Sequence, residues 1–583
     1  MKRKIVVTLV GLLLMVGMEC PLANYTHNAD YAASAMFGYG KAYAAEVEGI
    51  YEKEIKMIYT TEPALAYTFY GLTNETVVMD VLTRLNRMGS KATFFISEVE
   101  MRRYPKLVQL IGKNGHEIGI AIRPLDGATL LQTRSQISSA RNMLQSRFGV
   151  NTNMLKQPGG PITDTTLQAM LAEGCVMIGQ SVNVVQSKHK DYQTAEQIAS
   201  EIFPKAIRSY GRGQIVHFRM DFYTNNRLVG ELMEIIKQRR IDNIAYETFY
   251  DNPENNPSND SRYKLKPVGA LLNNKKYVYR YPVALQEVPA KLRKDGPAFD
   301  LEKSGSVNHI SHRYIGNKAV TDGDRILNFS KMETRRFDKS GLIHTNEKVI
   351  FLTFDDWGSD AALNKLMYVL RKHNVTGAFF IITRTVLNNP NLLRALAAEG
   401  HEIASHSDEH KPMSFRDLKT GKLVASQSNK AEYVQELIAS FGKLRDVVGN
   451  VTVNGHPSLT RFLRPPQLAL SKLGLEAAFE AGYDFIVNGS FSTRDYEAKD
   501  AAELVSRIRN GIFTDKGEVI KGSILVMHMS DPSPLTPVAL DLLLTANAAK
   551  ADTDPSKFKV GRLSDYLIEG YSQIDRGKSL KLK

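Results

Sequence analysis

The sequence has only two cysteines among its 583 residues, Cys20 and Cys175, which excludes a fold held together by several disulfides. If Cys20 is removed with an N-terminal segment, no intramolecular disulfide can form in the rest of the chain. Apolar residues follow Cys175 directly, and they predict a buried core thiol rather than a nucleophile. With 22 prolines and 41 glycines, the chain is not collagen-like.

Long apolar runs are absent beyond the N-terminus, which excludes a polytopic membrane protein. Acidic residues are in deficit, since 75 Lys and Arg face 62 Asp and Glu and give a net charge of +13. A basic surface suits anionic partners such as nucleic acid, acidic lipid or wall polymer. The basic residues are dispersed without an aromatic-basic stacking motif, so we expect no nucleic-acid partner.

The N-terminus resembles an export signal. Lys2-Arg3-Lys4 precedes an apolar run from Ile5 to Met18, which is a positive region followed by a stretch too short to span a bilayer comfortably. We therefore expect residues 1–45 to form an export segment and the protein to be extracytoplasmic: secreted, periplasmic or on the cell surface. Cleavage, retention and membrane anchoring through this segment all stay open.

The chain repeats itself. Three short motifs recur at a constant separation of 285 residues, which predicts a duplicated domain because the register holds without a gap over about fifty residues. The matching pairs are Thr68-Phe69 with Thr353-Phe354, Phe94-Phe95-Ile96 with Phe379-Phe380-Ile381, and Gly115-His116-Glu117-Ile118 with Gly400-His401-Glu402-Ile403. At a typical size of ~100–250 residues per domain, this length suits two or three compact units. We expect a first copy over residues 46–250, a connector over 251–344 and a second copy over 345–583.

Each copy alternates apolar strands with helical stretches, which predicts parallel strands covered by helices, in an open α/β sheet or a barrel. In the first copy the expected strands are 65–69, 92–97 and 117–122, and the expected helices are 77–87 and 106–113. The second copy carries an insertion around residues 411–428.

The connector begins with a polar, proline-containing cluster over 251–260 that ends the first copy. Residues 275–283 alternate well enough to predict a strand, so the connector is expected to hold a small β element. We assign it no function.

Two adjacent carboxylates, Asp355 and Asp356, end the first apolar strand of the second copy, where α/β folds place their active sites. Tyr70 and Gly71 occupy these positions in the first copy. An isolated Asp-Asp pair is most often a solvated turn.

Two imidazoles, His406 and His410, follow a later strand of the second copy at a spacing that can converge on one ion. The first copy has Ala121 and Leu125 there. An H-x-x-x-H pair alone is usually surface helix or satisfied core, but the joint placement of both motifs at strand ends favours a metal site. His116 and His401 persist in both copies, including the one without the ligands, so we interpret them as structural.

Two histidines and one carboxylate leave coordination positions open for water and substrate, as a catalytic zinc site requires. The same set of ligands also suits the divalent ions of cobalt, nickel, iron or manganese. Asp355, adjacent to the ligand Asp356, is then available as a base.

These residues are where a resemblance appears. Thr353-Phe354-Asp355-Asp356 and His406-Ser407-x-x-His410 resemble the first two motifs of the NodB-type polysaccharide deacetylases, and the resemblance covers residues 345–535. It implies a distorted (β/α) barrel with fewer than eight strands, present twice, with a degenerate first copy and an intact second copy.

The remaining motifs of that family can be sought residue by residue. Arg464-Pro465-Pro466 resembles the third motif, Asp495-Tyr496 the fourth and the strand ending in Val526-Met527-His528 the fifth. The sequence departs from the family at Gln467, where an aromatic residue is usual, at Tyr496 and Val526, which replace Trp and Leu, and at Trp357, which separates Asp356 from Gly358.

The resemblance implies a role for each residue. A divalent metal, zinc in the first instance, is held by Asp356, His406 and His410, while Asp355 is the base. The other catalytic residues are Arg464, which holds that base, and His528, the acid oriented by Asp495. The implied substrate-binding residues are Pro466, Gln467, Tyr496 and Val526, with a backbone amide near Gln467 in the oxyanion hole.

For an exported basic enzyme of this family, the expected substrate is an N-acetylated polysaccharide, with peptidoglycan first. Poly-N-acetylglucosamine, chitin oligomers and O-acetylated xylan are also compatible. Two further hypotheses remain: the first copy is a glycan-binding module or a scaffold, or the whole protein is a non-catalytic wall-binding factor. The sequence does not determine the oligomeric state.

Overall fold

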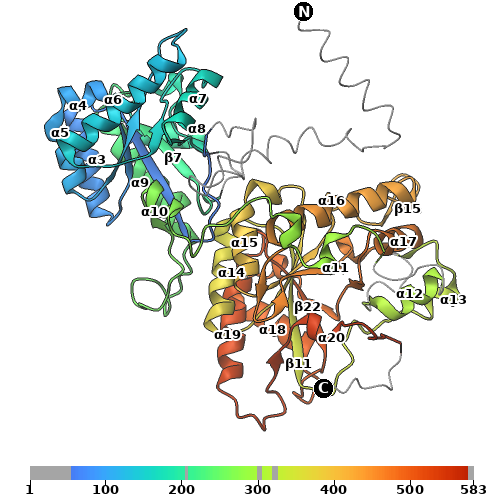
Figure 1. The fold of residues 1–583 in the computed structure, drawn as a ribbon. Helices are drawn as coiled ribbons and strands as arrows, with labels where there is room; N and C mark the ends of the chain where they lie inside the picture. Colours follow the sequence, from blue (N-terminus) through green and yellow to red (C-terminus); the bar gives the residue numbers. More distant parts are fainter. Residues whose placement is uncertain (1–53, 204–207, 298–304, 318–325, 575–583) are drawn as a thin grey trace, which may run out of the picture.

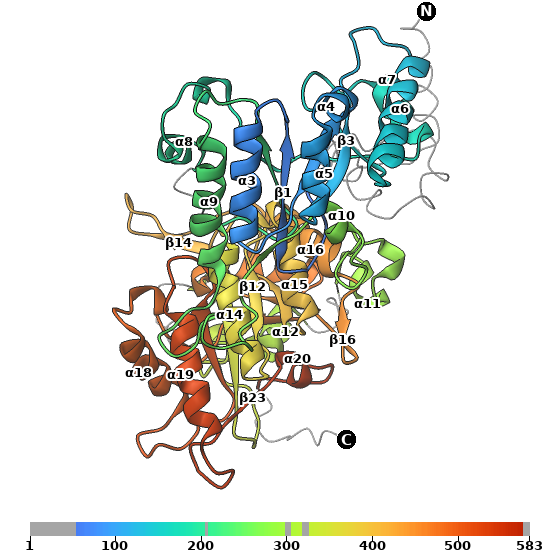
Figure 2. The ribbon, with the colours of Figure 1, turned by 90° about the vertical axis from the view of Figure 1, so that its left-hand side faces the viewer.

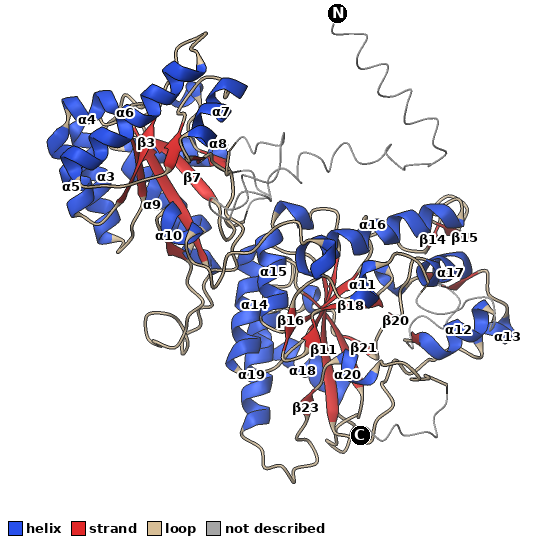
Figure 3. Ribbon diagram, in the orientation of Figure 1, coloured by secondary structure: helices blue, strands red, loops and turns tan. Residues whose placement is uncertain are grey.

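The computed structural model describes residues 54–203, 208–297, 305–317 and 326–574. The expected export segment, 1–45, lies outside the described residues. Two parallel sheets, each flanked by helices, form two separate bodies joined by the connector (Figures 1 and 3). Within the described ranges, no helix combines the length and the apolar character needed to cross a membrane.

The first copy is built on an eight-stranded sheet whose named pairings are all parallel. Its order is β5-β4-β3-β2-β1-β7-β6, with β8 pairing β1. The strands are β1 (Ala64–Tyr70), β2 (Thr93–Ser97), β3 (Glu117–Ala121), β4 (Met154–Lys156), β5 (Val176–Met177), β6 (Val182–Asn183), β7 (Ile215–Arg219) and β8 (Lys264–Leu265). The helices are α3 (Glu75–Arg87), α4 (Glu98–Arg103), α5 (Pro105–Lys113), α6 (Leu130–Phe148), α7 (Asp164–Ala172), α8 (Ala195–Ile202), α9 (Leu228–Arg240) and α10 (Val268–Leu272). The five elements expected here are confirmed to within two residues at each end.

The second copy repeats this plan around the strand path β21-β22-β11-β12-β13-β18-β20-β9, with β23 pairing β11. Its strands are β11 (Val349–Asp356), β12 (Ala378–Ile381), β13 (Glu402–Ser405), β18 (Leu459–Leu463), β20 (Phe485–Val487), β21 (Phe491–Ser492), β22 (Ser523–His528) and β23 (Lys559–Val560), joined by β9 (Tyr314–Ile315) from the connector. The helices are α14 (Asp360–Lys372), α15 (Pro390–Ala398), α16 (Lys430–Val448), α17 (Lys472–Glu480), α18 (Ala501–Ile512), α19 (Thr536–Ala548) and α20 (Leu563–Tyr566). The expectation of fewer than eight strands is wrong for this copy, because its own segment supplies eight strands and β9 from the connector makes the sheet nine-stranded.

Local sequence explains why these elements form. The apolar residues Val77, Val81 and Leu85 recur at helical spacing in α3 and are all buried, and Asn74 caps the helix by accepting a hydrogen bond from the Val77 amide at 3.4 Å. Strand β11 is buried at every position except Asp356, as expected for a parallel strand with helices on both faces.

The insertion in the second copy forms a short hairpin of β14 (Ser414–Arg416) and β15 (Leu423–Ala425). Cys175 is 4% exposed, which confirms a core thiol. The structural interpretation of the shared histidines is also confirmed, because His116 Nδ1 accepts from the Ala92 amide and His401 Nδ1 from the Gly377 amide, both at 3.3 Å.

The strand expected over 275–283 is wrong. Tyr279 and Tyr281 are buried in alternation with Arg280, but within the described residues the only ladder contact is a single bridge between Val278 and Thr60. Pro282 has no amide hydrogen to donate to a ladder, and the tyrosines are held by other partners. Tyr279, for example, donates from its hydroxyl to Asn391 Oδ1 at 2.9 Å. The connector's described strands lie elsewhere, with β8 in the first sheet, β9 in the second, and β10 (Ile326–Leu327) paired with β19 (Leu470–Ser471).

The two copies meet along α14 and α15, beneath α9 in Figure 2. Arg212 of the first copy is buried and donates to Thr61 O at 2.6 Å, to Tyr263 Oη at 2.7 Å and to Asn364 Oδ1 at 3.1 Å. From the other side, Asn391 donates to Ile58 O at 2.9 Å and to Arg212 O at 2.7 Å. Satisfied buried polar groups of this kind fix one relative orientation of the copies, because any shift leaves them unpaired.

Candidate metal and catalytic site

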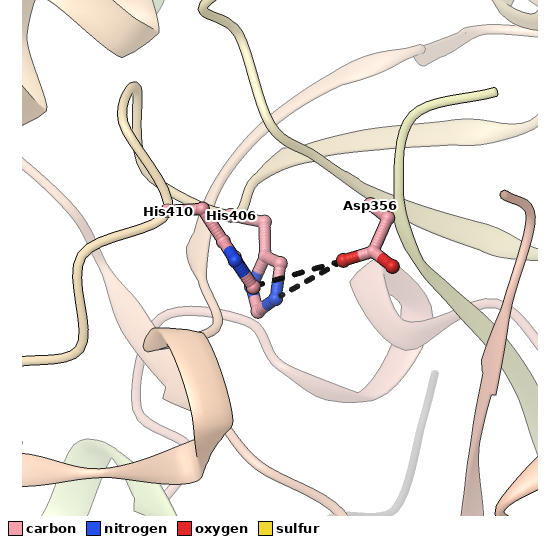
Figure 4. A group of neighbouring side chains, drawn as sticks. All are labelled: Asp356, His406 and His410. Atoms are coloured by element: carbon pink, nitrogen blue, oxygen red, sulfur yellow. Dashed lines mark ion pairs between the residues drawn. The ribbon is translucent and has the colours of Figure 1, made fainter. Parts of the chain in front are cut away.

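Asp356, His406 and His410 come together at the carboxyl edge of the second sheet (Figure 4). Their candidate ligand atoms lie within 4.8 Å of one another. Asp356 Oδ1 is 4.0 Å from His406 Nε2 and 3.7 Å from His410 Nε2. Asp356 ends β11, whereas both histidines lie in the loop after β13, two strands along the sheet, so parallel strands that end at one edge bring residues fifty positions apart to one point.

The backbone is shaped to aim these ligands. Asp356, Ser407 and His410 have φ values of 82°, 68° and 57°, in the left-handed region that costs a non-glycine residue about 1 kcal/mol. Local hydrogen bonds hold the histidine loop, since Ser407 N donates to Ser405 Oγ at 3.0 Å and His410 N to Ser407 Oγ at 3.1 Å. The two histidines, four positions apart, therefore converge from a loop rather than from one face of a helix.

The tautomer of His406 suits a metal ligand. Its Nδ1–H donates to the Arg464 carbonyl at 2.7 Å, which leaves the Nε2 lone pair facing Asp356. Burial lowers the pKa of His406, so the imidazole stays neutral. Ser530 Oγ donates to the other oxygen of Asp356 at 3.3 Å. Imidazole nitrogens and one supported carboxylate form a donor set that fits zinc and its first-row neighbours.

Asp355 lies beside this cluster and pairs with Arg464. The carboxylate is 3% exposed, and its Oδ1 accepts from Arg464 Nη1 at 2.5 Å. Burial alone would raise the pKa of Asp355, but the charge and hydrogen bond of Arg464, with the charge of His528, outweigh it and hold that pKa below its usual value. Asp355 is therefore a buried carboxylate that stays ionised.

Arg464 is fully buried and is held from three sides. It donates to the Val487 carbonyl and to Thr353 Oγ1, both at 2.9 Å, and its guanidinium lies 4.0 Å from the centre of the Phe380 ring. A guanidinium fixed in this way presents its charge to Asp355 without rotamer freedom.

His528 ends β22 and pairs with Asp495. Its Nδ1–H donates to Asp495 Oδ1 at 2.7 Å, and its amide donates to Asp495 Oδ2 at 2.8 Å. Thr536 Oγ1 also donates to Asp495 Oδ2, at 2.7 Å. Burial lowers the pKa of His528, but the bond to Asp495, with the charges of Asp495, Asp355 and Asp356, outweighs it and raises the pKa to about 9. His528 is therefore an imidazolium at neutral pH.

The strand register places the His528–Asp495 pair beside the Asp355–Arg464 pair. In the β11–β22 pairing, Asp355 is the direct partner of His528, and the Met529 amide donates to the Asp355 carbonyl at 3.1 Å. An ionised carboxylate and an imidazolium thus lie side by side next to the cluster of Asp356, His406 and His410.

The four expected substrate-binding residues differ in their burial. Tyr496 is 50% exposed and stands edge-on to the His528 ring at 5.0 Å. Gln467 is exposed in a left-handed conformation with φ 56°. Pro466 and Val526 are buried, and the Val526 side chain packs against Gly489. Tyr496 and Gln467 are therefore exposed, with Tyr496 beside His528, whereas Pro466 and Val526 are buried.

Sequence reasoning missed the supporting residues Ser530, Thr536 and Thr353, which contact Asp356, Asp495 and Arg464. Ser530 and Thr536 follow β22 closely, so their position after a motif strand was an available signal. The link from Thr353 to Arg464 crosses 111 residues and appears only in the fold.

In the first copy, other side chains occupy the corresponding carboxyl edge of the sheet. Register pairs Tyr70 with Arg219 as it pairs Asp355 with His528. Arg219 forms an ion pair with Asp221 at 2.7 Å, and Gly71 lies so close that a Cβ there would be 2.5 Å from the Asp221 side chain. Within the described residues of this copy, no group of histidine, cysteine and carboxylate side chains could hold an ion.

The fold and this edge define a (β/α) barrel of the polysaccharide deacetylase class, present once with the site and once without it. The family model for polysaccharide deacetylase matches residues 58–178 and 343–486. Two separate segments match this one family model, which supports a duplicated domain of the NodB polysaccharide deacetylase type.

Among curated relatives, the chain is similar to peptidoglycan-N-acetylglucosamine deacetylase PgdA of Listeria monocytogenes, with 30% identity over 201 residues, 34% of this chain and 36% of PgdA. It is also similar to peptidoglycan-N-acetylmuramic acid deacetylase PdaA of Bacillus subtilis, with 30% identity over 151 residues, 26% of this chain and 50% of PdaA. The chain thus spans between about a third and a half of these relatives' lengths. A solved structure of peptidoglycan deacetylase PdaC from Bacillus subtilis is 18% identical, with a TM-score of 0.29, over 37% of this chain and 94% of that one.

Proposed function

We propose that the second copy is a metal-dependent hydrolase that removes N-acetyl groups from an extracytoplasmic polysaccharide. One observation carries the proposal: an ionised Asp355 held by Arg464 and a cationic His528 held by Asp495 are strand partners beside a three-ligand cluster. Amide hydrolysis requires a base for water and an acid for the departing amine.

Asp356, His406 and His410 would hold the divalent ion, with zinc first and cobalt, nickel, iron or manganese compatible with the same donors. When bound, such an ion supplies Lewis acidity at the reacting acetyl group. Asp355 precedes the proposed ligand Asp356 in the sequence, but it pairs with Arg464. We therefore assign it to proton transfer and not to metal binding.

In the first half of the reaction, Asp355 takes a proton from the attacking water, and Arg464 keeps the carboxylate ionised until then. The backbone amide near Gln467 is proposed to stabilise the charge that develops on the acetyl oxygen, an interaction typically worth about 3–4 kcal/mol. Pro466, whose ring fixes its φ angle, restricts the course of this turn.

In the second half, His528 gives a proton from Nε2 to the departing sugar amine. Its Nδ1–H stays bonded to Asp495, so the ring keeps its orientation when the proton leaves. Tyr496, standing against the His528 ring, and Val526 are proposed to shape the acetyl pocket.

Peptidoglycan is the first proposed substrate. The relatives PgdA and PdaA are named as peptidoglycan deacetylases, and the basic chain, with a net charge of +13, suits an anionic wall. An extracytoplasmic location follows from such a substrate and from the N-terminal sequence, with cleavage or anchoring of that segment open.

Acetate release tests the proposal directly. The metal-loaded protein is incubated with peptidoglycan, an N-acetylglucosamine oligomer and O-acetylated xylan, beside Asp355→Asn and the control Asp515→Asn, which removes an exposed carboxylate from a distant loop. We expect release from an N-acetylated polymer that disappears only in Asp355→Asn. Release from xylan alone would identify an O-acetyl esterase, and no release from any polymer by a metal-loaded protein would favour a non-catalytic glycan binder.

A further inference from the structure

A pocket beside His528 is built by both copies. It has a volume of about 230 Å³ and lies between the first turn of α14, the loop after β22 and the first copy. Arg208 and Asn243 of the first copy form one wall, and Lys365, Ser533 and His528 belong to the second copy. The degenerate copy thus reaches the neighbourhood of the proposed acid.

Two of the residues that line this pocket carry a buried polar atom without a hydrogen-bond partner among the described residues. The atoms are Asn243 Oδ1 and Ser533 Oγ, and Ser533 is only 4% exposed. The Asn243 amide nitrogen donates to the Arg208 carbonyl at 2.9 Å, which fixes its oxygen as the acceptor that remains. Leaving such groups unpaired is unfavourable by about 1–3 kcal/mol each, so they favour a ligand that carries hydroxyl donors.

Lys365 adds a donor of its own. Its ammonium makes no hydrogen bond or ion pair within the described part of the chain, although Asp531 and Glu247 lie near enough to act on its charge. Arg208 faces Asp531 at 3.7 Å. With two cations opposite two carboxylates, the pocket favours a neutral, hydrogen-bonding ligand rather than an anion.

The first-copy wall is fixed in place. Ser209 Oγ accepts from the Ala361 amide at the start of α14 at 3.0 Å, and Arg212 donates to Asn364 on the same helix. The short 3₁₀ turn Asp242–Ile244, which carries Asn243, packs on α14 as well. A preorganised wall orders few side chains when a ligand binds.

Size and lining suit one sugar unit. The volume exceeds the roughly 150 Å³ of an engineered cavity that accepts benzene, so a six-membered ring with substituents fits. Apolar faces of Leu366, Pro534 and Pro537 lie among the polar atoms. A pyranose presents the same combination of C–H faces and hydroxyls.

We propose that this pocket is a second sugar subsite, which binds the hexosamine unit adjacent to the one that loses its acetyl group. Hydroxyls of that unit donate to Asn243 Oδ1 and Ser533 Oγ, and one of its oxygens accepts from Lys365. This inference rests on the proposed function. The proposed subsite gives the degenerate copy a role in substrate binding and not only a structural role.

The test compares a long and a minimal substrate on the full-length, metal-loaded protein. The long substrate is the N-acetylglucosamine tetramer, and the minimal one is 4-nitrophenyl acetate, which offers only an acetyl group. The variants are Asn243→Ala in the first copy and Lys365→Met in the second. Their matched controls, Asn86→Ala and Lys516→Met, change exposed residues away from the pocket.

We expect each pocket variant to lower the ratio of kcat/KM for the tetramer to kcat/KM for the ester about three- to tenfold, mainly through KM, as the loss of one hydrogen bond predicts. The controls should leave the ratio unchanged. An unchanged ratio in both pocket variants, or an equal loss on both substrates, would overturn the subsite.

Binding to the Asp355→Asn protein separates this inference from the proposed function. If the wild type turns over neither substrate, the deacetylase proposal fails, yet a tetramer dissociation constant that rises about three- to tenfold with Asn243→Ala still supports the subsite. If the wild type deacetylates the tetramer and all variants bind it equally, the subsite fails and the deacetylase stands.

Discussion

The pairing of His528 with Asp495 gives the sharpest prediction. Asp495→Asn keeps the size of the side chain but removes its charge. The pKa of His528, raised to about 9 in the protein against an ordinary 6.5, should then fall to 6.5 or lower, because burial opposes the charged ring. A shift of about 2.5 units corresponds to roughly 3 kcal/mol.

The consequence at pH 8 follows from these values. About nine-tenths of His528 is protonated when its pKa is about 9, whereas about 3% is protonated at an ordinary pKa. The fraction of enzyme with a competent acid should fall about thirtyfold in Asp495→Asn. The alkaline limb of the kcat/KM profile should move down by at least two pH units.

Two assays check this prediction. Proton NMR titration of the metal-free protein reports the pKa of His528 directly, with His528→Gln identifying its resonance. The pH profile of acetate release reports the same group during turnover. If the His528 resonance of Asp495→Asn still titrates near 9, the attribution of the raised pKa to Asp495 is refuted.

The same shift has a consequence for stability. Since the pKa of His528 is raised on folding, to about 9, its contribution is fully present below pH 6.5 and is lost as the pH rises through 9. The difference in unfolding free energy between wild type and Asp495→Asn should therefore shrink between these two pH values, as measured by urea unfolding.

Further predictions concern the interface and a buried histidine. Arg212→Met removes three hydrogen bonds, of which the one to Asn364 joins the two copies, and should lower the unfolding free energy by about 2–4 kcal/mol in urea melts, while the exposed control Arg227→Met changes it by less than about 0.5 kcal/mol. Burial lowers the pKa of His401 to about 3, so its stabilisation is present above pH 6.5 and is lost as the pH falls towards 3. His401→Gln should reduce the loss of unfolding free energy between pH 7 and pH 4.5 by roughly 2–3 kcal/mol, and an equal loss in both proteins would contradict the role of burial.

Much of the fold could be predicted from periodicity and repetition. The buried run of β11 and the helical spacing in α3 carry strong local signals, because both elements bury apolar residues in a regular pattern. The cluster of candidate ligands could be predicted because the parallel strands of one sheet end at the same edge, so placing Asp356 near His406 needed no knowledge of distant contacts.

The failures have physical reasons. Residues 275–283 do alternate in burial, but their tyrosines are buried by neighbouring elements and not by a sheet, and alternation cannot distinguish these cases. The wall formed by Arg208 and Asn243 depends on how two copies dock, and neither residue belongs to a motif. Residues that act across an interface leave no local pattern.

The most direct test of the proposed mechanism compares two neighbouring carboxylates. Metal content and acetate release from peptidoglycan are measured for Asp355→Asn and Asp356→Asn in parallel. We predict that Asp355→Asn keeps one equivalent of metal and releases no acetate, whereas Asp356→Asn loses both. Acetate release at the wild-type rate by Asp355→Asn, or full metal content in Asp356→Asn, would contradict the assignment of base and ligand.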